Sequence, residues 1–127
     1  MFRWVFSKGN FRREKQDGRL DTIGREEFLE FTKSVWTLTA ESARKIGHPA
    51  PFPVELAYRL VRMFSFSGDT VLDPFMGTAT SLLAAARCSR NVIGVEIEPS
   101  YVKMAKARLE EELSTLFEQD RPEIILR

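Results

Sequence analysis

The sequence predicts an α/β fold in which a short parallel sheet is flanked by helices. Two short apolar runs, residues 70–73 and the Val- and Ile-rich residues 91–98, alternate with segments of helical periodicity. Nearly continuous apolar runs are typical of strands that are buried on both faces of a parallel sheet. The order helix–strand–helix–strand–helix is that of a right-handed βαβ unit with its flanking helices. A chain of 127 residues has room for one ordinary domain.

The first third of the chain is less regular. Residues 2–7 alternate large apolar and other side chains, which predicts a strand, and the polar residues 8–21 predict a loop or a mobile arm. Apolar side chains at helical spacing predict a short helix over residues 25–36. Three prolines among residues 48–53 exclude a helix there and predict an extended segment. Regular structure is therefore expected mainly after this segment.

From Val54 onward the elements follow one another closely. Helical spacing of Leu56, Leu60 and Phe64 predicts an amphipathic helix, which we expect Gly68 to end. Pro99 suits the first turn of a long helix. The predicted elements are a helix at 54–66, a strand at 70–73, a helix at 78–90, a strand at 91–98, a helix at 99–119 and a candidate third strand at 123–127.

Charge is unevenly distributed along the chain. The net charge is +1, but residues 1–20 carry +4 and residues 48–127 carry −2. A basic arm on a nearly neutral body is typical of a nucleic-acid-binding surface, and a solvated, flexible leader is an equally good interpretation. Arg12, Arg13 and Lys15 are the candidates for contacts with DNA phosphates.

Composition excludes several classes of protein. No run approaches the ~20 apolar residues of a membrane span, and the first residues lack the features of a signal peptide. A single cysteine, Cys88, excludes an internal disulfide framework, and no metal site is expected. We therefore expect a cytoplasmic protein with two regions. We expect residues 1–47 to form an N-terminal strand, a basic arm and a segment that leads into the next region, and residues 48–127 to form the α/β domain.

Three residues suggest a ligand site at the carboxyl ends of the strands, where parallel sheets bind ligands. Asp73 ends the first strand, Gly77 opens the turn into the next helix, and Glu96 lies at the end of the second strand. Glycine lets the backbone approach a ligand closely. In nucleoside-binding βαβ units, an acid about 20 residues further on accepts hydrogen bonds from the ribose hydroxyls. Glu96 is the candidate for that role.

The turn itself favours one kind of nucleoside over another. A dinucleotide needs a turn with several glycines for its pyrophosphate, whereas this turn has Gly77 alone, preceded by an acid. Asp73 would repel a phosphate and attract an ammonium group. S-adenosylmethionine, a nucleoside with an amino-acid tail and no phosphate, is therefore favoured over NAD. An ordinary α/β core with acids at its strand ends remains the alternative.

Residues 48–109 closely resemble the carboxyl-terminal half of the DNA amino-methyltransferases, the enzymes that methylate adenine N6 or cytosine N4. The resemblance is to their permuted beta class, and it rests on "HPAPFP", "DPFMGT" and "GVEIE" in family order and spacing. Upstream, "FRWVFSKG" and the segment from Phe31 to Pro53 resemble the family more weakly. The resemblance implies a partial Rossmann-like methyltransferase fold, S-adenosylmethionine as cofactor, DNA as substrate and a role in restriction–modification. It also implies that the basic arm within residues 1–47 is part, or a remnant, of the family's target-recognition region.

The resemblance also implies which residues bind the cofactor. Residues of "HPAPFP" match the segment that lies against the methionine part, those of "DPFMGT" match the cofactor loop, and Glu96 matches the ribose-binding acid. The cofactor-binding candidates are Pro51, Phe52, Pro53, Asp73, Phe75, Gly77, Thr78, Glu96 and Ile97.

The sequence departs from the family pattern at two points. Ala79 stands where a second glycine is usual, which costs on the order of 1 kcal/mol if that position needs a positive φ and nothing if it merely begins a helix. The catalytic motif, Asp/Asn/Ser-Pro-Pro-Tyr/Phe, is missing because the sequence has no Pro-Pro pair. That motif holds the flipped base.

No catalytic residue is therefore assigned to this chain. We expect a methyltransferase subunit that is active with a second chain carrying the motif, or else a homodimer. The alternatives are a non-catalytic cofactor- or DNA-binding regulator, a relic of such an enzyme, and methylation of RNA or a small molecule. The target base and the recognition sequence cannot be deduced from these residues.

Overall fold

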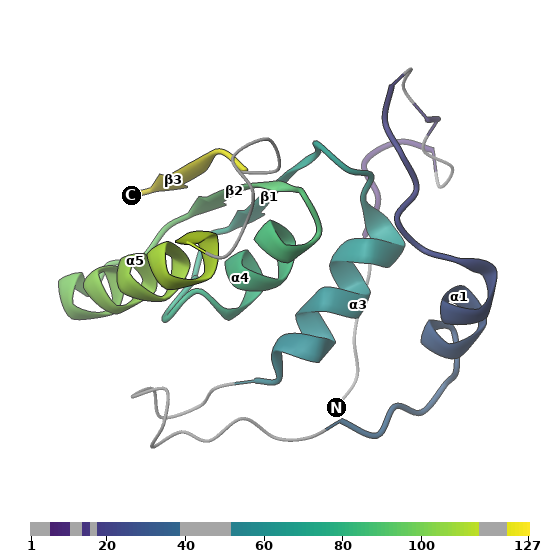
Figure 1. The fold of residues 1–127 in the computed structure, drawn as a ribbon, viewed down its shortest axis with the longest axis horizontal. Coiled ribbons are helices and arrows are strands. Elements are labelled where there is room, and N and C mark those ends of the chain that lie inside the picture. Colours follow the sequence, from purple (N-terminus) through teal and green to yellow (C-terminus); the bar gives the residue numbers. More distant parts are fainter. Residues whose placement is uncertain (1–5, 11–13, 16–17, 39–51, 115–121) are drawn as a thin grey trace.

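The computed structural model describes residues 6–10, 14–15, 18–38, 52–114 and 122–127 (Figure 1). Its three strands form one parallel sheet in the order β1-β2-β3, so the predicted βαβ unit and the third strand are confirmed. No helix of the described residues is long and apolar enough to cross a membrane. The elements are α1 (Arg25–Phe31), α3 (Val54–Phe64), β1 (Thr70–Asp73), α4 (Thr80–Arg87), β2 (Asn91–Gly94), α5 (Pro99–Ser114) and β3 (Ile124–Leu126).

The core lies between the sheet and its helices. Val71, Val92 and Ile124 are register partners across the three strands and share the face on which α4 and α5 pack. In Figure 1, α4 and α5 lie together on one side of the sheet, with α3 beside α4 and α1 beside α3. The resulting core cluster joins this row to Leu82 and Leu109 from the two helices.

Helix α4 is the most deeply buried element. Six of its residues are buried, and it contacts α3, α5, β1 and β2. Small side chains on both of its sides let α3 and the sheet approach its axis closely; Ala84 and Ala85 are completely inaccessible. The Ala-rich composition of this segment is thus explained by packing on two opposite faces rather than by helix propensity alone.

Two helices end earlier than predicted. Helix α1 ends at Phe31 rather than at residue 36, and the Thr32 hydroxyl donates to the carbonyl oxygen of Phe28 at 2.9 Å. Helix α3 ends at Phe64 rather than at residue 66 because Ser65 is extended (φ −143°) and its hydroxyl donates to the Val61 carbonyl at 2.5 Å. Hydroxyl groups that bond to the backbone of the preceding turn compete with continuation of a helix.

The prediction that a glycine ends α3 was also wrong. Gly68 lies beyond the end of the helix, in the turn that leads into β1, where it adopts φ +75°. Its amide donates to the Ser89 carbonyl at 2.7 Å, so this turn is fixed against the end of α4. The left-handed conformation is one that glycine adopts without steric cost.

The other boundaries differ less. Helix α4 begins at Thr80 rather than at residue 78, and it ends at Arg87 rather than at residue 90. Strand β2 ends at Gly94 rather than at residue 98 because its neighbour β1 ends at Asp73, although Val95 N still donates to the Asp73 carbonyl at 3.0 Å. Helix α5 is observed to Ser114; residues 115–119 of its predicted length lie outside the described residues.

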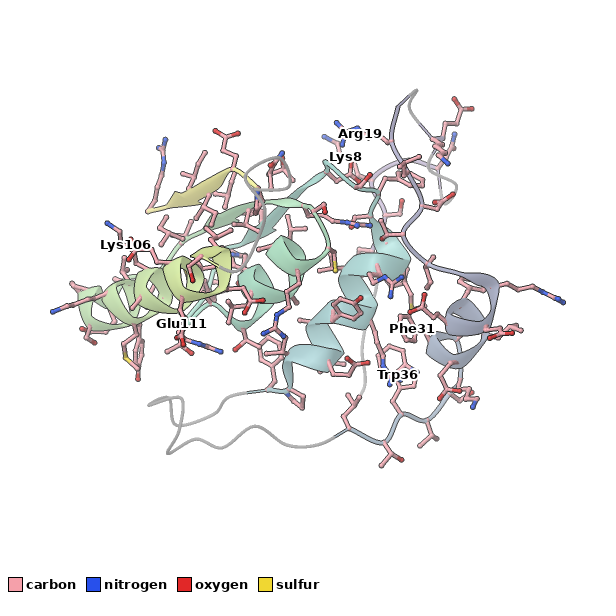
Figure 2. All side chains as sticks on the ribbon, in the orientation of Figure 1. Lys8, Arg19, Phe31, Trp36, Lys106 and Glu111 are labelled. Carbon is pink, nitrogen blue, oxygen red and sulfur yellow. The ribbon has the colours of Figure 1, made fainter. Side chains whose placement is uncertain are left out.

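The N-terminal region packs on the domain from residue 18 onward. Arg19 pairs with Asp69, the residue before β1. Figure 2 shows Arg19 next to the segment that joins α3 to β1. The amide of Leu20 donates to the Ser67 hydroxyl, and the Ser67 amide donates to the Leu20 carbonyl, both at 3.1 Å. Of the strand predicted at 2–7, Phe6 and Ser7 are not in a strand, and residues 2–5 lie outside the described part of the chain.

Helix α1 and the residues after it lie against α3. Figure 2 shows Phe31 and Trp36 on the side of α1 that faces α3. The Arg59 guanidinium stacks 5.0 Å from the Phe31 ring centre and 5.3 Å from that of Trp36. Arg62 forms a two-pronged ion pair with Glu27 at 2.7 and 2.8 Å. Trp36 therefore packs against α3 and not at the strand ends.

Arg90 is the largest completely buried side chain that the structure describes. Its guanidinium donates to the Ser65 hydroxyl at 3.0 Å, the Ser65 carbonyl at 2.6 Å, the Thr22 hydroxyl at 2.8 Å and the Cys88 carbonyl. Burial lowers the pKa of Arg90, yet a guanidinium stays charged in proteins. It therefore joins the ends of α3 and α4 to the N-terminal segment.

Arg90→Met is expected to lower the free energy of unfolding by about 2–4 kcal/mol, because the buried Cys88 carbonyl and the partly buried Ser65 carbonyl lose their donors at roughly 1–3 kcal/mol each. Arg87→Met is the matched control: Arg87 is 44% exposed and pairs with Glu112 at 2.7 Å, so its loss should cost less than about 1 kcal/mol. Urea unfolding monitored by circular dichroism measures both. Equal losses would show that the Arg90 bonds contribute no more than a surface ion pair.

Candidate functional site

The loop between β1 and α4 and the end of β2 meet at the carboxyl edge of the sheet. Asp73 and Gly94 are register partners at the ends of the two strands. The amide of Met76 donates to the Val95 carbonyl at 3.0 Å, which fixes the loop against the segment that follows β2. Residues far apart in the sequence are thus brought together where a parallel sheet usually binds its ligand.

Glu96 is held by two backbone amides at this edge. One carboxylate oxygen, Oε2, accepts from the Gly77 amide at 3.0 Å, and the other, Oε1, accepts from the Glu98 amide at 2.9 Å. The predicted proximity of Gly77 and Glu96 is confirmed. A carboxylate has about four lone-pair sites, so it can accept more hydrogen bonds than these two.

Asp73 is fixed in a similar way by its own loop. Its Oδ1 accepts from the Phe75 amide at 3.0 Å, and its Oδ2 accepts from the Ser81 hydroxyl in the first turn of α4. The side chain therefore keeps one orientation, and a negative charge is held at the carboxyl end of β1. Such a charge attracts a cationic group and disfavours a phosphate.

The turn contains two residues in the left-handed region. Gly77 has φ +52°, and Ala79, the residue before α4, has φ +67° and ψ +34°. Of the two alternatives for Ala79, a positive φ is the one observed. This conformation costs an L-residue about 1–2 kcal/mol. Ala79 is completely inaccessible and belongs to the core cluster, so burial of its methyl group offsets part of that strain.

Exposed apolar side chains flank the two acids. Phe75 is 89% exposed and Ile97 is 97% exposed, and each is within two residues of one of the acids. Phe52 is 40% exposed, and Pro53 is the residue before α3; Pro51 lies outside the described residues. Apolar surface beside a few fixed polar groups is typical of a small-molecule site.

Thr78 has a different environment from the other candidates. It is buried, and its hydroxyl and carbonyl oxygens accept from the Arg108 guanidinium at 3.1 and 2.6 Å. Arg108 therefore ties the loop to α5. No pattern in the sequence indicates this contact, because a single arginine on a charged helix has no distinguishing feature.

Gly94 is a second residue that the sequence reasoning missed. A Cβ at this position would overlap Met76 Sδ and lie 2.9 Å from Leu82 Cδ2. The glycine thus lets Met76 of the β1–α4 loop, which is 4% exposed, pack onto the end of β2. A glycine within a strand otherwise rich in Val and Ile is a recognisable indication of such a close approach.

The candidate DNA contacts are only partly described. Lys15 is exposed and pairs with Asp21 at 3.3 Å, and Arg12 and Arg13 lie outside the described residues. Within the described part of the chain, no group of three or more His, Cys, Asp or Glu residues could hold a metal ion.

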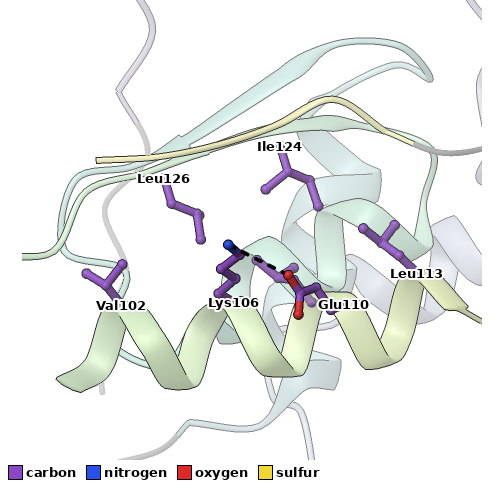
Figure 3. Close-up of a pocket in the computed structure, with 7 residues that line it drawn as sticks. Val102, Lys106, Glu110, Leu113, Ile124 and Leu126 are labelled. Carbon is purple, nitrogen blue, oxygen red and sulfur yellow. Dashed lines mark ion pairs between the residues drawn. The ribbon is translucent and has the colours of Figure 1, made fainter. Parts of the chain in front are cut away.

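A cavity of about 440 Å³ lies elsewhere, between α5 and β3 (Figure 3). It is lined mainly by apolar side chains, with Lys106 and Glu110 forming an ion pair across 3.9 Å beside it. None of the predicted cofactor residues lines this cavity. This cavity is therefore separate from the predicted site at the strand ends.

Comparison with known proteins identifies the family of this chain. Residues 4–107 match the sequence model of the N6/N4 DNA methylases. The type II methyltransferase M.MthZI of Methanothermobacter thermautotrophicus is 39% identical over an alignment of 94 residues, and the match covers 69% of this chain and 26% of that protein. M.MjaI of Methanocaldococcus jannaschii is 40% identical over an alignment of 105 residues, and the match covers 76% of this chain and 34% of that protein.

Solved structures agree with the sequence relatives. TTHA0409 of Thermus thermophilus, assigned as a DNA modification methylase, is 42% identical with a TM-score of 0.71, over 92% of this chain and 46% of that one. A second structure of the same protein contains S-adenosyl-L-methionine and matches with the same score. The chain thus spans about a quarter to a half of the length of these relatives.

Ala79→Gly is expected to leave the free energy of unfolding almost unchanged, because relief of about 1–2 kcal/mol of left-handed strain offsets the lost methyl burial and the entropy of glycine. Ala85→Gly removes an equally inaccessible methyl group from the middle of α4 and should cost about 1–2 kcal/mol. Urea unfolding compares the two. Equal destabilisation would mean that Ala79 carries no strain.

Proposed function

The chain belongs to the N6/N4 DNA methylase family, and we propose that it is the S-adenosylmethionine-binding half of a DNA methyltransferase that modifies adenine N6 or cytosine N4. The observation that carries this proposal is the geometry of Glu96. Its two carboxylate oxygens are oriented by the Gly77 and Glu98 amides at the carboxyl end of β2. This arrangement suits two adjacent hydroxyls of a ribose.

The residues around Glu96 fit the remaining parts of the cofactor. Asp73 supplies a fixed negative charge for the ammonium group of the methionine part, and the exposed side chains of Phe75 and Ile97 supply apolar surface for the adenine. Phe52 and Pro53 belong to the segment that we assign to the methionine part. When bound, S-adenosylmethionine supplies an electrophilic methyl group on a sulfonium.

The catalytic groups are proposed to come from a second chain. The sequence has no Pro-Pro pair and therefore lacks the motif that holds a flipped base in this family. The role of this chain is then to bind and orient the methyl donor, while the partner holds the target base. Arg12, Arg13 and Lys15 are proposed to contact DNA phosphates, which would position the duplex without selecting its sequence.

Titration calorimetry with S-adenosylmethionine tests the cofactor site. Glu96→Ala is expected to weaken binding roughly 100-fold, because hydrogen bonds to a charged group are each worth about 1.5–3 kcal/mol. Glu110→Ala removes the same charge from the exposed surface of α5 and should leave the affinity unchanged.

Two results would contradict this proposal. Unchanged affinity of Glu96→Ala would show that the ribose is not bound there. Absence of binding by the wild-type chain, both alone and with its partner, would exclude the cofactor itself.

Transfer of a radiolabelled methyl group to DNA tests whether a second chain supplies the catalytic groups. The chain alone is expected to give no product, because it lacks groups to hold the base. Addition of a chain from the same genome that carries Asp/Asn/Ser-Pro-Pro-Tyr/Phe should restore transfer, and Glu96→Ala in the mixture should lower it. Methylation by the wild-type chain alone would show that a second chain is not needed.

A further inference from the structure

The loop between β1 and α4 contains a tight turn. The amide of Ala79 donates to the Met76 carbonyl at 2.8 Å, which closes a β-turn with Gly77 and Thr78 at its centre. Gly77, the first central residue, has φ +52°, a conformation that glycine adopts without steric cost. The two central peptide groups are planar, so a few backbone torsions decide how the turn presents them.

Each central residue of this turn has its own partner outside the loop. The Gly77 amide donates to Glu96 Oε2 at 3.0 Å, at the carboxyl edge of the sheet. The Thr78 carbonyl and hydroxyl oxygens accept from Arg108 Nη1, on α5, at 2.6 and 3.1 Å. Because the two residues are joined within one closed turn, a displacement of Thr78 would also redirect the Gly77 amide.

The contact with Arg108 opposes a strain in the loop. Ala79 has φ +67°, which is unfavourable for an L-residue. Relaxation of this φ would rotate the peptide group that joins Thr78 to Ala79, and the carbonyl of that group is the one that Arg108 holds. Hydrogen bonds from a charged donor are stronger than those between neutral groups. Arg108 therefore keeps the turn in the strained conformation.

The burial of Thr78 separates it from the other cofactor-binding candidates. Thr78 is 4% exposed, whereas Phe75 and Ile97 are 89% and 97% exposed. The Thr78 hydroxyl thus meets a side chain of α5 inside the protein. Its contribution to a ligand site would be made through the backbone of the turn and not by direct contact.

From these contacts we infer that Arg108 is a positioning residue for the cofactor site. By holding Thr78, it orients the Gly77 amide and, through that amide, the carboxylate of Glu96. The methyl donor is bound more tightly because the loop is ordered before the ligand arrives. This inference rests on the proposed function, and it adds a residue of α5, outside the motifs of the strand ends, on which cofactor affinity depends.

Arg108→Met tests this role, because methionine keeps much of the apolar stem and removes the donors. Titration calorimetry is expected to show roughly tenfold weaker binding of S-adenosylmethionine, the effect of a loop that must be ordered on binding. Arg87→Met is the matched control. Arg87 also joins α4 to α5, through its ion pair with Glu112 at 2.7 Å, but it is the last residue of α4. Its loss should leave the affinity unchanged.

A double variant shows whether the effect of Arg108 passes through Glu96. Glu96→Ala alone is expected to weaken binding roughly 100-fold. If Arg108 acts by orienting Glu96, the variant with both Arg108→Met and Glu96→Ala should bind no more weakly than Glu96→Ala. Independent effects would instead multiply to roughly 1,000-fold.

NMR of the ligand-free chain adds a readout that a general loss of stability would not move. The Gly77 amide resonance should shift in Arg108→Met, because its bond to Glu96 is altered, and should stay in place in Arg87→Met. Arg108→Lys keeps the charge without the planar fork of the guanidinium. It should shift the resonance and lower the affinity less than Arg108→Met does, and it provides the same comparison if Arg108→Met does not fold.

Four outcomes would overturn the inference about Arg108. They are an unchanged affinity in Arg108→Met, a lower affinity without a shift of the Gly77 resonance, a roughly 1,000-fold loss in the double variant, and an equal loss in Arg87→Met. Absence of S-adenosylmethionine binding by the wild-type chain, both alone and with its partner, would contradict the proposed cofactor role, and the inference would fail with it.

The two failures can be told apart. Loss of the inference alone leaves a wild-type chain that binds the cofactor and a Glu96→Ala variant that binds it weakly.

Discussion

Burial of α4 on opposite sides is the constraint on which the other elements depend. The helix contacts the two strands β1 and β2 as well as α3 and α5, and only small residues such as Ala84 and Ala85 let all of them approach it. Because its position is fixed from several directions, its first turn is fixed too. The loop from Asp73 to Ala79 must therefore reach that turn within a few residues, and it does so through two left-handed positions.

Because the position of α4 is fixed, the candidate site at the strand ends is rigid as well. Both acids at the strand ends accept hydrogen bonds from backbone amides of their own surroundings, so no side-chain rearrangement is needed to orient them. Preorganised polar groups lower the entropic cost of binding. The apolar side chains beside them, Phe75 and Ile97, are by contrast highly exposed. The site thus combines fixed charges with adaptable apolar contacts.

The parts of the fold set by strong local patterns could be predicted from the sequence. The βαβ order, the parallel sheet and the meeting of Gly77 with Glu96 follow from apolar periodicity and from the usual position of the ribose acid. Helix ends at Phe31 and Phe64 could not be predicted, because they depend on hydroxyl–backbone bonds that compete with helix geometry. The burial of Arg90 and the contact of Arg108 with Thr78 depend on tertiary packing, which no local pattern encodes.

The close approach of β2 to the loop makes Gly94 and Met76 a single packing unit, although they lie far apart in the sequence. A side chain at position 94 would need the volume that the Met76 thioether now fills. A larger residue there is therefore compatible with the loop only when a smaller residue replaces Met76, and either change alone would move the backbone that presents the Gly77 amide. The mutational history of the two positions is expected to be shared, with substitutions fixed as pairs rather than one at a time.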